Sequence, residues 1–132
     1  MGGTVYNTLV CFSKLCNEKG EKPYFYGREN SEIHNFFYRE SKKYPSVFRH
    51  ISFSEGRDFH ESPEIIFDLE TLNISRLIHS WGIDFHPFET TEGMHKFYHK
   101  VPNKRIFNKI AEDFYSELGC LENGQRRKNL TK

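Results

Sequence analysis

The chain has 132 residues and a formal net charge of +1, with 36% hydrophobic and 28% charged residues. This is the length of one ordinary domain, and its 21 aromatic residues are enough for an apolar core, so global disorder is excluded. The near-neutral charge excludes the strongly basic class of nucleic-acid-binding domain.

The first predicted element is a β-hairpin over residues 4–27. Its first strand is TVYNTLVCFSKL, which is rich in β-forming residues and alternates between two sets of side chains. NEKGEK forms the polar turn, and PYFYG returns as the second strand.

A helix is predicted next, over residues 31–44. Ile33, Phe36 and Phe37 are spaced as on one face of a helix, and Pro45 predicts its end. SVFRHISFS then alternates between apolar and polar residues and predicts a strand.

Residues 62–70 fit two different structures. Ser62-Pro63-Glu64 is typical of a helix N-terminus, whereas EIIFDL is a compact apolar run typical of a buried strand. We favour the strand. Residues 71–81 predict a helix that Gly82 ends, on the helical spacing of Ile74, Leu77, Ile78 and Trp81.

A second hairpin is predicted over residues 83–101, with strands IDFHPFE and MHKFYHKV around the turn TTEG. The last helix covers residues 103–118, between a capping Asn103 and a terminating Gly119. One face of this helix is apolar and consists of Phe107, Ile110, Ala111, Phe114 and Leu118.

The order of these elements predicts the α+β class. We expect a single domain, with a mainly antiparallel sheet of about five strands and three helices packed on one face. The compact domain spans residues 1–119, and residues 120–132 form a basic, polar and flexible C-terminal tail. Residues 121–132 alone carry a net charge of +3.

Cysteine content and the N-terminus predict the compartment. The chain has three cysteines, an odd number, which favours free thiols in a reducing environment. MGGTVYNTLV lacks the basic segment and apolar run of a signal peptide, and no apolar stretch approaches the roughly 20 residues that span a bilayer. We expect a soluble, cytoplasmic protein with no membrane partner.

The second hairpin and the start of the last helix carry the densest group of functional side chains. Lys96, Tyr98 and Lys100 share one face of the predicted strand, and we expect them to anchor a partner. The full set of candidate binding residues is Lys96, Tyr98, Lys100, Lys104, Arg105, His86 and Glu89.

The sequence predicts no catalytic residue, metal site or cofactor. On a strand, His95 and His99 lie about 13 Å apart, too far to ligate one ion. They could ligate one ion only if this segment were helical, where residues i and i+4 share a face. None of the cysteines is placed as a nucleophile, and no phosphate-binding loop, dinucleotide fingerprint or HExxH motif occurs. These observations favour a protein without catalysis.

Two short segments resemble enzyme families. Thr4-Val5-Tyr6 and Phe25-Tyr26-Gly27 resemble the two strands of GIY-YIG nucleases, which implies Tyr6, Arg39 and Glu112 as catalytic residues; the strands are spaced too widely and the first Gly is absent. His86-Pro87-Phe88 resembles the opening of the Fic-family loop, but the Gly-Asn-Gly-Arg phosphate cradle does not follow.

The function that the sequence favours is binding of a macromolecule. Another protein is the favoured partner, as for small inhibitors, immunity proteins and phage anti-defence factors. The alternative is a nucleic-acid-binding protein or small nuclease, in which Lys96-Phe97-Tyr98-His99-Lys100 stacks on bases and pairs with phosphates.

Overall fold

The computed structural model describes residues 3–26, 30–55, 60–80, 87–90, 93–121 and 125–130. Within these ranges the α-helices are α1 (Thr4–Glu18), α2 (Asn30–Lys43), α3 (Pro63–Ile74) and α4 (Lys104–Leu118). The 3₁₀ helices are η1 (Pro45–Val47), η2 (Met94–Lys100) and η3 (Arg127–Leu130). The strands are β1 (Tyr24–Tyr26), β2 (Ser54–Glu55), β3 (His60–Glu61), β4 (Ile78–Ser80), β5 (Pro87–Thr90) and β6 (Gly119–Cys120).

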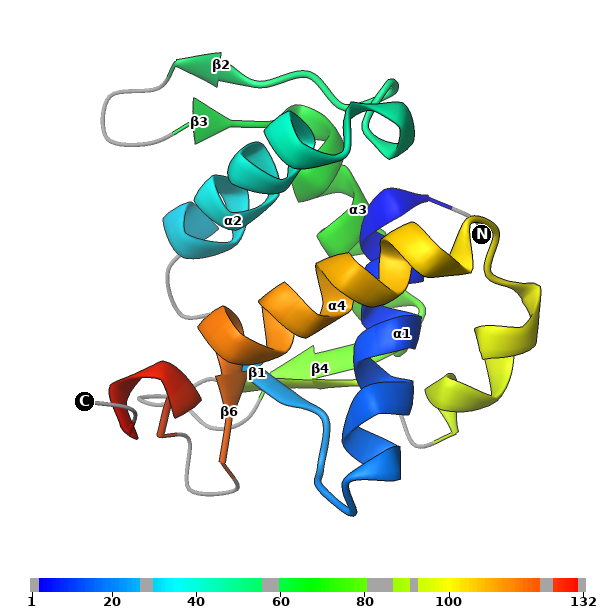
Figure 1. Ribbon diagram of the computed structural model, residues 1–132. Helices are drawn as coiled ribbons and strands as arrows, with labels where there is room; N and C mark the ends of the chain where they lie inside the picture. The colour runs from blue at the N-terminus through cyan, green and yellow to red at the C-terminus, as the bar shows by residue number, and fades with distance from the viewer. Residues whose placement is uncertain are drawn as a thin grey trace.

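The predicted fold class is wrong, because helices and not a five-stranded sheet form most of the described structure. The main sheet has the strand order β4-β5-β1-β6 with antiparallel neighbours, and each strand is short. β2 and β3 pair separately. Figure 1 shows α1 and α4 crossing at the centre, with α2 and α3 on one side and the main sheet on the other.

Helix α1 replaces the first strand of the hairpin predicted over residues 4–27; only its second strand is confirmed, as β1. Val5, Leu9, Phe12 and Cys16 follow a helical spacing and are all buried. α1 packs against α4, η2 and α3 at once. A helix enclosed by three elements gains more from burial than it loses by containing β-branched residues, which explains why tertiary packing overrides local propensity here.

The core is centred on Phe114 of α4. Its ring centroid lies 5.0 Å from that of Phe12, 5.2 Å from that of Phe25 and 5.3 Å from that of Phe36. The ring of Phe37 lies 6.2 Å away. One aromatic side chain therefore joins α1, β1, α2 and α4 through edge-on and tilted contacts, geometries that aromatic rings prefer.

Residues 63–70 lie in α3 and Ser62 is its N-cap, so the strand that we favoured over residues 62–70 is wrong. The Oγ of Ser62 accepts a hydrogen bond from the Ile65 N–H, and Pro63 occupies the first turn. The backbone N–H of Ser62 also donates to Nδ1 of the buried His34, 2.9 Å away, which ties the start of α3 to α2. The local N-terminal signal was stronger than the apolar run.

Several other boundaries differ from the predictions. The helices over 31–44 and 103–118 are confirmed as α2 and α4. The helix predicted over 71–81 is wrong after Ile74, because a turn there leads to β4. The strand predicted for SVFRHISFS is also wrong, because this segment forms the end of η1 and an irregular stretch that leads into β2. In the second hairpin, residues 87–90 form β5, but the partner strand is wrong because Met94–Lys100 is a 3₁₀ helix. Residues 81–86 lie outside the described residues.

Part of the predicted C-terminal tail contacts the domain. The Leu121 N–H donates to the Gln125 carbonyl, and Cys120 forms a β-bridge with Arg126. η3 packs against α4 and β6. The flexibility of residues 120–132 stays a prediction. None of the helices within the described ranges is both long and apolar enough to cross a membrane.

Candidate binding surface

The residues predicted to bind a partner are mostly gathered on η2 and the first turn of α4, which we call the η2–α4 surface. η2 runs alongside α1, as Figure 1 shows, and is anchored by the buried Met94 and Val101. The first turns of α4 are anchored by the buried Phe107. The exposed members of the surface are Lys96, Phe97, His99, Lys100 and Arg105, with Tyr98 and Lys104 half-buried among them.

The η2–α4 surface carries charge of one sign. The stretch from Met94 to Lys109 contains five Lys or Arg residues and no Asp or Glu, so the rest of the chain carries a net charge of −4 with His neutral. Cations gathered on one stretch raise the local electrostatic potential far above what the net charge of the molecule indicates. The arrangement can attract an anionic partner.

Tyr98 is held inside the surface by three neighbours. Its hydroxyl accepts a hydrogen bond from Nδ2 of Asn108, 2.7 Å away. Nζ of Lys14 lies 4.4 Å and Nζ of Lys104 lies 5.6 Å from the centre of the Tyr98 ring. These contacts join η2 to α1 and α4, and they give Tyr98 a structural role in addition to the binding role predicted for it.

Lys104 also closes the C-terminal end of η2. Its ammonium group donates to the carbonyls of His99, at 3.1 Å, and Val101, at 2.9 Å. A cation at this end of a helix satisfies carbonyls that have no partner within the helix. Lys104 is therefore partly committed to the fold, whereas Lys96, Lys100 and Arg105 point their charge to solvent.

Phe97 is exposed on this surface but is absent from the predicted set of binding residues; it was predicted only as part of the segment that would stack on bases in the nucleic-acid alternative. On the predicted strand it shared a side with Val101, but in the 3₁₀ helix its side chain is 41% exposed. The buried positions of this segment are Met94 and Val101, with Tyr98 half-buried. Their spacing of four and three residues is helical, and it was the signal that could have identified Phe97 as exposed.

The remaining predicted residues lie elsewhere. Glu89 is on β5, between β1 and β4 in the sheet, and not on η2. His86 lies outside the described residues. Among the residues that the structure places, no group of three His, Cys, Asp or Glu side chains could hold a metal ion. Thr4-Val5-Tyr6 lies in α1, so one of the two strands needed for the GIY-YIG resemblance is a helix.

Comparison with models of known protein families, with curated proteins and with solved structures gave no match.

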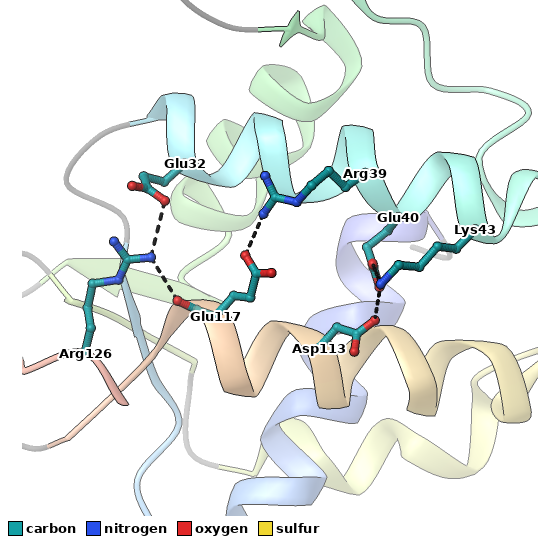
Figure 2. A network of polar contacts seen from close by, with 7 residues as sticks. All are labelled: Glu32, Arg39, Glu40, Lys43, Asp113, Glu117 and Arg126. Carbon is teal, nitrogen blue, oxygen red and sulfur yellow. Dashed lines mark hydrogen bonds and ion pairs between the residues drawn. The ribbon is translucent and has the colours of Figure 1, made fainter. Parts of the chain in front are cut away.

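A second polar cluster joins α2, α4 and the C-terminal segment (Figure 2). The guanidinium of Arg39 pairs with Glu117, and that of Arg126 contacts Glu32 at 3.3 Å and the Glu117 carbonyl at 2.9 Å. The Arg126 guanidinium also lies 4.4 Å from the ring centre of Tyr26. These contacts join β1, α2, α4 and the C-terminal segment to one another.

Glu40 is the buried member of this cluster. Its side chain is 3% exposed, and Nζ of Lys43 lies 3.2 Å from both the Glu40 and the Asp113 carboxylates (Figure 2). Burial, together with a hydrogen bond to Asp113, raises the pKa of Glu40 to about 7. One Lys43 ammonium group thus neutralises two carboxylates only in part, and the charge of the cluster changes with pH near neutrality.

Proposed function

We propose that this protein is a small, non-catalytic binding protein of the cytoplasm that recognises an acidic surface of another protein, in the manner of an inhibitor or an immunity factor. The observation that carries the proposal is the η2–α4 surface, where exposed cations and an exposed aromatic ring occupy one segment without any acidic residue between Met94 and Lys109. Aromatic residues and Arg are the types enriched where proteins bind each other.

A protein partner is favoured over a nucleic acid because of Tyr98. Stacking of a base requires an open ring face, but the ammonium groups of Lys14 and Lys104 lie next to the Tyr98 ring. On the described part of η2, Phe97 is then the exposed ring. A single exposed ring among cations fits an apolar pocket with an acidic rim better than a strand of successive bases.

The cytoplasmic location is supported by the cysteines. Cys11, Cys16 and Cys120 are all buried and free of disulfides. Burial raises the pKa of the Cys11 and Cys120 thiols to about 11 and that of Cys16 to about 12. Such thiols stay protonated and react slowly, so they pack as small apolar groups, as is usual in reducing compartments.

Replacing Lys96, Phe97 and Lys100 together with alanine is expected to remove partner binding. Aromatic anchors at an interface centre contribute about 2 kcal/mol or more, so the affinity should fall roughly 30-fold or further. The melting temperature should stay within about 2 °C, because surface substitutions change stability by less than about 0.5 kcal/mol. The measurement is capture from source cells by immobilised protein, followed by affinity determination with the captured partner.

A matched control places the same residue types elsewhere. Lys22 and Phe67 are both exposed and lie outside the surface, so a Lys22→Ala/Phe67→Ala variant should bind normally.

Tyr98→Ala should lower the melting temperature, because the contacts of Tyr98 hold η2 against α1 and α4. Capture that survives the triple substitution contradicts the proposal, and capture that nuclease treatment abolishes replaces it with the nucleic-acid alternative.

A further inference from the structure

A cleft of about 500 Å³ lies where four elements meet: the start of α1, η1 and the loop after it, the first two turns of α3, and the start of α4. This volume is within the range of sites that hold small molecules. The apolar part of its lining consists of Val47, Ile51, Pro102 and Phe107. The polar part includes Asn7, Arg49, His50, Glu64 and Asp68.

Glu64 and Asp68 lie one turn apart on α3, and both line the cleft. Among the described residues, only Glu64 of these two accepts hydrogen bonds. An Oε1 of Glu64 accepts hydrogen bonds from both the backbone N–H and the hydroxyl of Ser52, at 2.5 and 2.7 Å. Asp68, one turn further along α3, forms no hydrogen bond or ion pair with any described residue. Burial raises the pKa of Asp68, and the neighbouring charge of Glu64 adds to this shift.

The positive charge on the cleft lining, that of Arg49, also has no ion-pair partner among the described residues. Arg49 is exposed, lines the same cleft, and forms no ion pair with any residue in the described ranges, including Asp68. Asp68 is directed to the start of α1, since its Oδ2 lies 3.5 Å from where a Cβ on Gly3 would be. The cleft lining thus includes an anion and a cation that form no ion pair with each other, together with apolar side chains.

We infer that this cleft binds a small zwitterion with an apolar body, the chemistry of an amino acid or a very short peptide. The ligand's ammonium group pairs with Asp68, its carboxylate pairs with Arg49, and its hydrocarbon part covers Val47, Ile51 and Phe107. A metal ion does not fit these residues, because the described chain gathers no three metal-ligating side chains. This site is separate from the η2–α4 surface and does not depend on the proposed function.

The test uses three probes that share one hydrocarbon chain. Norleucine carries both charges, pentylammonium lacks the carboxylate and hexanoate lacks the ammonium. Titration of the isotope-labelled full chain by NMR should show saturable shifts for norleucine at amides near Gly3, Asn7 and residues 46–51. Pentylammonium and hexanoate should each bind about 10-fold more weakly or worse, since one charge pair is worth roughly that factor.

Two variants with matched controls decide the outcome. Asp68→Asn and Arg49→Gln should each weaken norleucine binding about 10-fold, whereas Glu70→Gln on the exposed side of α3 and Arg105→Gln on the η2–α4 surface should leave it unchanged. Among the described residues, neither Asp68 nor Arg49 has a hydrogen-bond or ion-pair partner to lose, so both variants should keep the wild-type amide spectrum. The inference is overturned if the three probes bind equally, if Arg49→Gln and Asp68→Asn bind normally, or if no probe gives saturable shifts in the cleft.

Discussion

Replacing Phe114 with alanine is expected to lower the free energy of unfolding by about 3–5 kcal/mol, the usual cost of removing a buried aromatic ring. Phe114 is 1% exposed, and its ring contacts the rings of Phe12, Phe25 and Phe36. The substitution leaves a cavity that α1, β1 and α2 cannot close together, because each is held by its own contacts. The measurement is urea unfolding at equilibrium, followed by circular dichroism.

Two further variants make this expectation specific to the position. Phe114→Leu retains most of the volume and should lose clearly less stability than the alanine variant. Phe67→Ala removes a ring that is 68% exposed on α3, and it should change the free energy of unfolding by no more than about 0.5 kcal/mol. Equal losses at Phe67 and Phe114 would contradict the core described above.

Replacing Glu40 with glutamine is expected to stabilise the protein by about 3 kcal/mol at about pH 8, since burial raises the pKa of Glu40 from 4.5 to about 7 and each unit of that shift corresponds to about 1.4 kcal/mol. Glutamine keeps the shape of the side chain, removes the charge that burial disfavours, and can still donate a hydrogen bond to Asp113. Lys43 then has one carboxylate to neutralise instead of two.

The dependence on pH has a definite sign. The pKa of Glu40 is about 7 in the folded protein against an ordinary value of 4.5, so the folded state holds this proton more tightly than the unfolded state. The wild-type protein should therefore lose stability as the pH rises from about 4.5 to about 7, and Glu40→Gln should lose less over that range. Glu112→Gln, an exposed control on α4, should follow the wild type. A glutamine variant less stable than the wild type at about pH 8 would show that Glu40 is ionised and well paired there.

The sequence was sufficient for the helices that have one buried face. In α4, Phe107, Ile110, Ala111, Phe114 and Leu118 are buried and most positions between them are polar, so the period of the helix is visible directly. The same holds for α2. In α1, by contrast, Val10 and Cys11 are buried as well as Leu9 and Phe12, because other elements cover the helix on several sides. Burial on all sides removes the amphipathic period, and the remaining β-branched residues then suggest a strand.

The candidate binding surface was only partly predictable for a related reason. Lys96, Lys100 and Arg105 are exposed, as expected of charged side chains. The aromatic ring that is exposed beside them depends on the backbone conformation. A strand would expose Tyr98 and bury Phe97, whereas in the 3₁₀ helix Phe97 is exposed and Tyr98 is half-buried. The cleft could not be predicted, since Arg49 and Asp68 come together only through the packing of η1 and α3 around the start of α1.

Amide hydrogen exchange of the protein, alone and in complex with its captured partner, tests the binding surface most directly. Added protection of residues 93–106, with the far face of α2 and the exposed side of α3 unchanged, is the result that the η2–α4 surface predicts. Protection confined to α2 or α3, with residues 93–106 exchanging as in the free protein, would contradict it.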